Sequence, residues 1–373
     1  MKILHVIIGL EASGAELFLK RLVLQQRENQ HHVTVISLTS DGKLATLLRA
    51  GSVTVYSLGL TGIASIPAVI WRLRKLVKAV APDIVQSWMY HADFITSLAL
   101  AGLRQKLIWS VRCSEVPAGS KATFGIMKLC AALSYFKPAR VCYVATAARE
   151  YHQQHGYCKS RNDVIANGYD FSTLRSDELK RQQYRQQLGI DDSTVLFGMV
   201  GRFHPDKGQD LLLEAMSLLQ HDVSDAKLVL IGRGCNTENA ELANLVNLFS
   251  LQQHVLLVGE QTDIPGWLSA LDIYVMASRT EGFPNALAEA MSVGVPCVAT
   301  EVGDAPVLAQ THAVFCRPDS HSLASAMQSV LNWPAQQRQS FGAEAAAFVR
   351  NSFSIAEIEK KYYQMYLKVL ESE

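Results

Sequence analysis

Two short loops in the second half of the sequence carry charged residues at spacings that suit a phosphorylated ligand. In the first, Gly201 to Gly208, Arg202 and Lys207 lie five residues apart across a proline-containing turn. A guanidinium fork and an ammonium group suit a diphosphate, because together they offset the negative charge that grows on a departing phosphate. The spacing alone also fits a solvated basic loop.

The second loop, Ser278 to Met291, carries two glutamates. Pro284 and Gly294 bracket a short helix, which places Glu281 in the loop and Glu289 inside the helix. A carboxylate suits a vicinal sugar diol because both of its oxygens accept hydroxyl protons. The amides at the helix start offer further donors to hydroxyls or phosphate. The alternative is purely structural: Glu281 would cap the helix, and Glu289 would lie on the protein surface.

Buried strands must position these loops. Short β-rich runs alternate with segments of helical period, which is the pattern of βαβ units around parallel sheets. The predicted strands are Ile3 to Ile8, Val33 to Leu38, Val53 to Leu58, Ile84 to Ser87, Leu107 to Val111, Val141 to Ala145 and Val164 to Ala166, then Val195 to Val200, Leu228 to Ile231, Val255 to Val258, Ile273 to Met276, Cys297 to Thr300 and Val314 to Cys316. Such sheets bind ligands at the carboxyl ends of their strands, so the chemistry is expected in the loops that follow.

The length of 373 residues exceeds what one core usually supports, so the chain is expected to form two domains. Asp170 to Asp192 is polar and poor in strand signals, and it predicts a linker with a surface helix at the boundary. The segment Ile355 to Leu370 has tyrosines and leucines at helical spacing and could pack on either domain.

The composition excludes several classes of protein. A net charge of +1 provides no general basis for binding nucleic acid. The seven scattered cysteines never form C-x-x-C, which favours reduced thiols over a zinc site. The apolar run Ile3 to Leu10 is too short for a membrane span and reads as a first strand rather than a signal peptide. We therefore expect a cytoplasmic protein.

The glutamate frame E-G-F-P-N-x-x-x-E-A-M, together with Gly201-Arg202 and Lys207-Gly208, resembles the retaining GT-B glycosyltransferases of family 4, the bacterial group 1 type. The resemblance covers nearly the whole chain. It implies an α/β fold with two Rossmann-like, doubly wound domains that face across a cleft. An acceptor-side domain would span 1–172, a nucleotide-sugar-binding domain would span 173–354, and a C-terminal helix at 355–373 would cross back to the first domain.

The resemblance also implies roles for single residues. Arg202 and Lys207 would bind the donor diphosphate, and Glu289 would bind the ribose hydroxyls. His91 would face the sugar near the reacting carbon; helix capping is its alternative role. The catalytic set is then Arg202, Lys207, Glu281 and His91, and the donor-binding set is Gly14, Gly201, Arg233, Gly282, Phe283, Pro284, Asn285 and Glu289.

Two of the donor-binding residues lie in less specific surroundings. The glycine loop around Gly14 would let the first domain approach the donor, although a plain tight turn explains it equally well. Arg233 stands in the expected base pocket, where the family more often has an acidic or a small residue.

The resemblance implies transfer of a hexosyl group, with retention, from a nucleotide diphosphate sugar with UDP as the expected nucleotide. The expected acceptor is a glycan or a lipid-linked glycan of bacterial surface polysaccharide assembly, such as O-antigen, capsule or exopolysaccharide. No D-x-D occurs, so neither a metal nor another cofactor is expected. The alternatives are a nucleotide-sugar epimerase on the same fold and a non-catalytic sugar-nucleotide-binding protein. The missing G-x-G-x-x-G disfavours a nicotinamide dehydrogenase.

Two basic amphipathic segments, Ile66 to Val80 and Lys121 to Lys137, suggest peripheral contact with the anionic inner face of the cell membrane. For the first segment, an ordinary helix with one solvated face explains the pattern equally well. No nucleic acid partner is expected.

Overall fold

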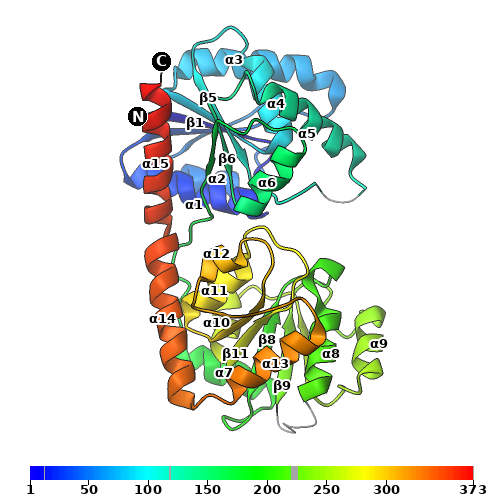
Figure 1. Cartoon of the computed structure of the whole chain (residues 1–373). Helices are drawn as coiled ribbons and strands as arrows, with labels where there is room; N and C mark the ends of the chain where they lie inside the picture. The colour runs from blue at the N-terminus through cyan, green and yellow to red at the C-terminus, as the bar shows by residue number, and fades with distance from the viewer. Residues whose placement is uncertain (12, 117–118, 220–225, 373) are drawn as a thin grey trace. The chain divides into compact units, whose positions relative to one another are not determined.

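The computed structural model describes residues 1–11, 13–116, 119–219 and 226–372 (Figure 1). Ala12, in the predicted glycine loop, lies outside them. The chain divides into two compact units, Met1–Tyr169 with Phe353–Glu373, and Asp170–Ser352. The division falls after residue 169, where the sequence places it after residue 172.

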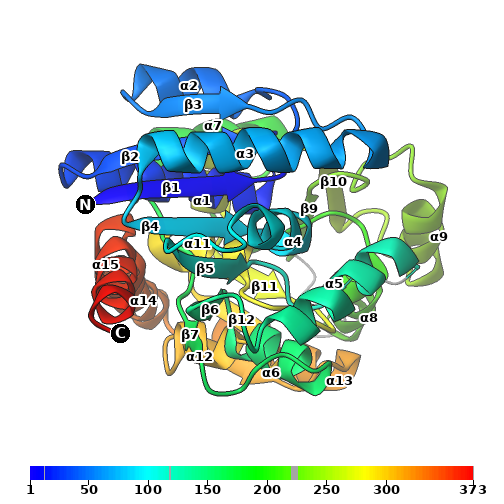
Figure 2. The same cartoon turned by 90° about the horizontal axis from the view of Figure 1, so that it is seen from above.

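The first unit contains one parallel sheet of seven strands in the order β3-β2-β1-β4-β5-β6-β7 (Figure 2). Each predicted strand of this half is present with its ends shifted by a few residues. The strands are β1 (Lys2–Ile7), β2 (His32–Ser37), β3 (Thr54–Ser57), β4 (Ile84–Trp88), β5 (Lys106–Val111), β6 (Arg140–Tyr143) and β7 (Asn162–Val164). Every residue of β4 is buried, as expected of a central strand covered on both faces.

Helices cover this sheet. In α3, Val69, Leu73 and Val77 recur every fourth residue and are all buried, so one stripe of the helix packs on the sheet. The helices of this unit are α1 (Gly14–Glu28), α2 (Leu44–Ala50), the 3-10 helix η1 (Ile63–Ser65), α3 (Ile66–Val80), α4 (Met89–Ala99), α5 (Lys121–Leu133), α6 (Thr146–Gln154) and α15 (Ile355–Glu371).

The C-terminal helix α15 packs on α1, which places it in the first unit as the family resemblance implies. A buried chain of polar side chains fixes this packing. Gln26 of α1 donates to the Tyr366 hydroxyl at 3.2 Å, and Tyr366 in turn donates to Gln86 of β4. A buried polar group without a partner costs free energy, so these hydrogen bonds favour one position of α15 on the first unit.

The second unit contains a parallel sheet of six strands in the order β10-β9-β8-β11-β12-β13. Its strands are β8 (Leu196–Val200), β9 (Lys227–Ile231), β10 (Val255–Gly259), β11 (Ile273–Met276), β12 (Cys297–Thr300) and β13 (Val314–Cys316). Its helices are α7 (Glu178–Leu188), the 3-10 helix η2 (Pro205–Lys207), α8 (Gln209–Leu219), α9 (Ala240–Leu248), α10 (Ile264–Ala270), α11 (Asn285–Val293), α12 (Ala305–Ala309), α13 (Ser320–Leu331) and α14 (Ala335–Phe353). The predicted α/β class with two doubly wound parallel sheets is confirmed.

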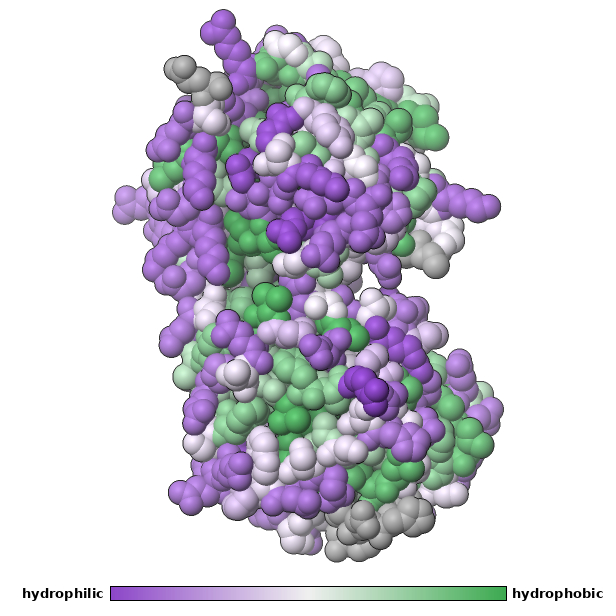
Figure 3. All heavy atoms as spheres, in the orientation of Figure 1, coloured by the Kyte–Doolittle hydropathy of each residue, from purple (hydrophilic) through white to green (hydrophobic). Residues whose placement is uncertain are grey.

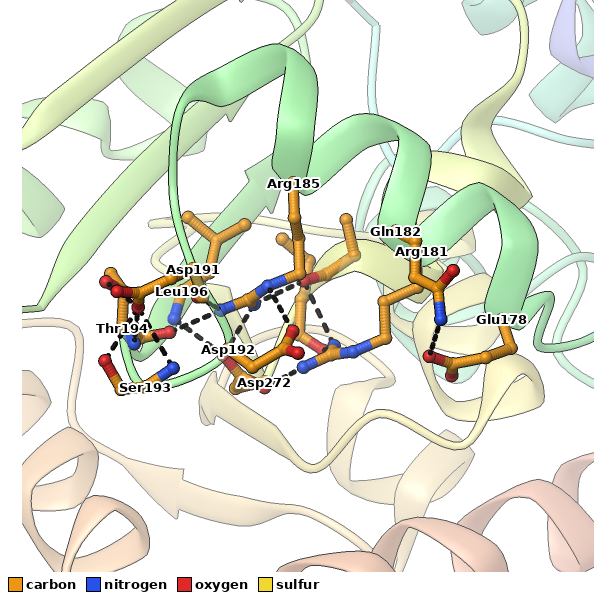
Figure 4. A network of polar contacts seen from close by, with 12 residues as sticks. Glu178, Arg181, Gln182, Arg185, Asp191, Asp192, Ser193, Thr194, Leu196 and Asp272 are labelled. Atoms are coloured by element: carbon orange, nitrogen blue, oxygen red, sulfur yellow. Dashed lines mark hydrogen bonds and ion pairs between the residues drawn. The ribbon is translucent and has the colours of Figure 1, made fainter.

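The predicted surface helix at the boundary is only partly correct. Helix α7 begins with an exposed polar turn, but Tyr184 stacks on Trp267 of α10 and Arg185 is 2% exposed. Figure 4 shows Arg181 and Arg185 converging on Asp272, at the start of β11. Arg181 Nη2 lies 2.7 Å and Arg185 Nη1 lies 3.0 Å from the Asp272 carboxylate. This network fastens α7 to the sheet of the second unit.

Two further findings concern the cysteines and the length and apolar character of the helices. The seven cysteines are free thiols; Cys113 and Cys316 are partly exposed and the other five are buried. Across the described residues, no helix combines the length and the apolar character needed to cross a membrane.

Candidate active site

The site of the second unit lies where the strand order reverses. Strand β8 pairs with β9 on one side and with β11 on the other, so the loops that follow β8 and β11 leave adjacent carboxyl ends in different directions. Ligands of doubly wound sheets bind at such a switch point. The loop after β8 contains η2 and Lys207, and the loop after β11 contains Glu281 and leads into α11.

A pocket of about 230 Å³ opens at this point. Four of its lining residues carry the argument: Lys207, Ser278, Glu281 and Glu289. Lys207 Nζ lies 2.6 Å from Glu281 Oε1, and the Ser278 hydroxyl donates to the same oxygen at 2.7 Å. The two loops singled out in the sequence therefore meet in one pocket.

Helix α11 supplies the rest of the polar wall. It begins at Asn285 after an N-cap at Pro284, and it ends at Gly294 with φ +89°, so the bracketing residues act as the sequence predicts. Phe283, Pro284, Asn285 and Glu289 all line the pocket. The first amides of a helix point outward and favour anionic oxygens, so this end of α11 is suited to phosphate or sugar hydroxyls.

Two glycines allow the loops to approach so closely. Gly208 follows η2 with φ +70°, and a Cβ there would lie 2.1 Å from the carbonyl oxygen of Ala277. Gly303 has φ +55°, and its Cβ would lie 2.0 Å from the carbonyl oxygen of Glu281. Any side chain at either position would push the Lys207 loop or the Glu281 loop out of place.

Arg202 does not join Lys207 in the pocket. Its side chain is exposed and is absent from the pocket lining, while its backbone oxygen accepts a hydrogen bond from the buried Gln209 side chain at 2.8 Å. Gly201 does line the pocket. Arg233 is exposed, and its backbone oxygen accepts from Phe203 N at 2.8 Å. The structure thus brings together Gly201, Lys207, Glu281 and Glu289, but neither arginine side chain.

His91 and Gly14 belong to the first unit, and they share its own switch point. Strands β1 and β4 pair side by side, with Ile7 opposite Trp88. Gly14 is the first residue of α1 after β1, and His91 lies in the first turn of α4 after β4. Partial burial lowers the pKa of His91, which favours the neutral imidazole near pH 7.

Several residues of the second unit's site have no role in the sequence prediction. Ser278 binds Glu281, and Tyr274, 1% exposed, lines the pocket together with Met199 and Met276. Burial raises the pKa of Tyr274 well above its usual value, so its phenol stays neutral. Alternation along β11 puts Tyr274 and Met276 on the same face, a signal that could have identified them.

The part of the chain that the structure describes holds no group of three or more histidine, cysteine, aspartate or glutamate side chains arranged to bind a metal ion.

Comparisons with known proteins agree with this arrangement. A family model described as Glycosyltransferase Family 4 matches residues 12–173, and one described as Glycosyl transferases group 1 matches residues 194–332. The chain is 35% identical over 150 residues to the lipopolysaccharide core biosynthesis mannosyltransferase LpsB of Rhizobium meliloti, covering 39% of this chain and 42% of that protein. It is 32% identical over 141 residues to the Escherichia coli UDP-Gal:alpha-D-GlcNAc-diphosphoundecaprenol alpha-1,3-galactosyltransferase, covering 37% and 36%.

A third relative, the uncharacterized glycosyltransferase MJ1059 of Methanocaldococcus jannaschii, is 25% identical over 63% of this chain and 60% of its own length. The matched stretches thus span between 36% and 60% of these curated relatives. Among solved structures, Anabaena Alr3699/HepE in complex with UDP superposes with a TM-score of 0.83 at 22% identity, covering 99% of this chain and 100% of that chain.

Two parallel-sheet α/β units with a polar pocket at a switch point define a GT-B glycosyltransferase fold. The two family models match both units, and the chain belongs to the family 4, group 1 glycosyltransferases.

Proposed function

We propose that this protein transfers a hexosyl group from a UDP-sugar to a glycan or lipid-linked acceptor, with retention and without a metal, in bacterial surface polysaccharide assembly. The observation that carries the proposal is the contact between Lys207 and Glu281, from two separate loops, inside one pocket. An ammonium group and a carboxylate side by side match the two ends of a sugar phosphate.

Lys207 and Glu281 still have hydrogen-bond donors and acceptors for such a ligand after they have bound each other. An ammonium group has three donors, and one of them serves Glu281, which leaves two for oxygens of a diphosphate. Both hydrogen bonds to the Glu281 carboxylate, from Lys207 and Ser278, reach Oε1. Oε2 can then accept from a sugar hydroxyl, while Glu289, which also lines the pocket, accepts from the ribose.

In the proposed reaction, the bond between the anomeric carbon and the β-phosphate oxygen breaks, and the nucleotide diphosphate leaves with the electron pair. The acceptor oxygen bonds to the anomeric carbon on the same face, and its proton passes to a phosphate oxygen of the leaving group. Lys207 offsets the charge that grows on that group, which lowers the barrier. Arg202 and His91 are proposed to contribute to the same reaction, as the family resemblance implies.

The relatives guide the choice of donor and acceptor. The names of two of them concern lipopolysaccharide core and a diphosphoundecaprenol acceptor, and the HepE structures hold UDP or UDP-glucose. We therefore take UDP-hexoses and lipid-linked glycans as the first substrates to test.

Transfer in the presence of EDTA tests the proposal. With UDP-hexoses and a lipid-diphosphate-linked acceptor, we expect UDP release coupled to product formation, unchanged by excess EDTA. NMR of the product should show the anomeric configuration of the donor. Loss of transfer on chelation would refute metal independence, an inverted product would refute retention, and epimerised donor without acceptor would indicate the epimerase.

We also propose peripheral contact of the first unit with an anionic membrane. Helices α3, α4 and α5 pack side by side, and green, hydrophobic residues reach the right margin of the upper part of Figure 3. Residues 61–137 contain ten lysines and arginines but only three acidic residues, Asp83, Asp93 and Glu115. A positive surface with apolar anchors suits the headgroup region of an anionic leaflet.

The two predicted membrane segments differ in how well they suit contact with a membrane. In α3, Arg72 and Arg74 bind carbonyl oxygens of Leu58 and of Ala99 and Ala101, so these two cations stabilise the unit itself. Trp71 of α3 is 63% exposed, whereas the segment at α5 exposes both Leu129, on the helix, and Phe136, three residues after its end, with Phe136 at 81%. The α5 segment is therefore the better candidate for an anchor.

Flotation with vesicles tests this contact. The double change Leu129→Ser and Phe136→Ser should reduce binding to vesicles containing phosphatidylglycerol by roughly a hundredfold or more, because two apolar side chains contribute about 1.5–3 kcal/mol each when buried. Leu248→Ser is the matched control, since Leu248 is 72% exposed on α9 of the second unit. Equal flotation of the double variant and the control would contradict the proposal.

A further inference from the structure

Arg279 connects the two loops of the site, although its side chain is absent from the pocket lining. Its Nη1 and Nη2 bind Oδ1 and Oδ2 of Asp210 at 2.8 and 2.5 Å, which is a bidentate pair. Nη1 also donates to the carbonyl oxygen of Pro205 at 2.8 Å, and the backbone N of Arg279 donates to the carbonyl oxygen of Asp206 at 2.7 Å.

The partners of Arg279 flank Lys207 on both sides. Pro205 and Asp206 belong to η2 with Lys207, and Asp210 lies in the first turn of α8. Arg279 itself lies two residues before Glu281, in the loop after β11. One guanidinium group therefore joins the segment that carries the site's lysine to the segment that carries its glutamate.

Such a connection matters because Lys207 and Glu281 are 74 residues apart in the chain. Their separation depends on contacts between the two loops rather than on the covalent chain. Gly208 and Gly303 allow close approach, but they do not hold the loops together. The hydrogen bonds of Arg279 are directional, and a bidentate guanidinium fixes both distance and orientation.

The charge on Asp210 depends on the same contact. The Arg279 guanidinium lowers the pKa of the Asp210 carboxyl, so this group remains ionised and the pair stays intact well below neutral pH. The Asp206 carboxylate, the other acidic group of this loop, lies 3.1 Å from His204 Nδ1.

We propose that Arg279 is a positioning residue: by binding Asp210 and the η2 backbone, it sets the separation of Lys207 and Glu281 for the donor substrate. This inference rests on the proposed function, which it deepens. Arg279 lies outside the pocket lining. It acts through Lys207, and its removal changes the geometry of the pocket rather than its charge.

The expected effect is larger on turnover than on folding. The pair is partly exposed, at 39% and 43%, and pairs of this kind contribute little to global stability. Misplacement of a catalytic group by about 1 Å, however, can cost about a hundredfold in rate. Arg279→Gln should therefore lower kcat by about 10- to 100-fold, with a smaller change in KM for the donor and a nearly unchanged Tm.

Matched variants separate positioning from a general loss of surface charge. Asp210→Asn should reproduce the kcat loss of Arg279→Gln, and the double variant should lose little more than either single variant, because both remove one connection. Arg279→Lys keeps the charge without the fork and should restore only part of kcat. Arg49→Gln is the control, since Arg49 pairs with Asp41 at 2.7 Å on the surface of the first unit with similar exposure.

Hydrogen–deuterium exchange provides a test that does not depend on activity. In Arg279→Gln, the amides of residues 203–212 should exchange faster than in the wild type, while those of the first unit should not change. Unchanged exchange together with wild-type kcat would overturn the positioning role. If the variant shows faster exchange but the wild type turns over no nucleotide sugar, the connection of the two loops by Arg279 stands. The proposed function is then rejected instead.

Discussion

Lys207→Ala is expected to lower kcat for glycosyl transfer by more than about a hundredfold, the typical cost of losing one oriented group that stabilises developing charge. The ammonium group is the cation that the pocket itself contains, and its loss also leaves the Glu281 carboxylate, 11% exposed, without its ionic partner. Steady-state release of UDP with saturating donor measures the effect.

Lys180→Ala is the matched control for this result. Lys180 also pairs with a carboxylate of the second unit, Asp263, at 3.1 Å, but it lies on α7 outside the pocket. Its kcat should remain within about twofold of the wild type. Full activity of Lys207→Ala, or an equal loss in both variants, would refute the role of Lys207.

The second large effect concerns stability. Asp272→Ala should lower the free energy of unfolding by about 3–5 kcal/mol, because it leaves the buried Arg185 guanidinium without its carboxylate (Figure 4). Asp272 also accepts a hydrogen bond from Leu196 N at 2.8 Å and binds Arg181, so α7, β8 and β11 all lose a contact. Urea denaturation followed by circular dichroism measures the loss.

Asp192→Ala provides the internal comparison. Asp192 lies 3.7 Å from Arg185 Nε, but its side chain is 94% exposed, so water screens this pair. Its removal should change the free energy of unfolding by no more than about 0.5 kcal/mol. A similar loss in the two variants would mean that burial does not govern the strength of the Arg185 interactions.

The central strands of the two sheets could be predicted from the sequence because they are buried on both faces. Continuous apolar runs bounded by turn residues indicate such strands, and the strands at 273–276, 297–300 and 314–316 agree with the prediction residue for residue. Helix α7 was harder to predict. Its composition is polar, and nothing local indicates that Arg185 is buried against Asp272, 87 residues away.

The site could be predicted in part for a related reason. Lys207 and Glu281 lie in loops whose ends are set by strands and glycines, Glu289 lies in helix α11 after the second loop, and the structure places all three in one pocket. The expectation that Arg202 converges with Lys207 on a single point rests on spacing alone. Spacing does not determine the direction of a long side chain, and the Arg202 side chain is solvent-exposed outside the pocket lining. The connection made by Arg279 depends on a residue 69 positions away, which no local pattern reveals.

The points where the chain leaves and rejoins the first unit are neighbours. Tyr169 N donates to the carbonyl oxygen of Phe353 at 2.9 Å, and Ile355 N donates to the carbonyl oxygen of Tyr169 at 2.8 Å. The residues from Asp170 to Ser352 therefore form an insertion into the first unit, and hydrogen bonds hold its two ends close together. Insertions with adjoining ends are the kind that recombination can exchange as a block. The second unit, with the pocket proposed for the donor, could thus be exchanged between related genes without disturbing the fold that receives it.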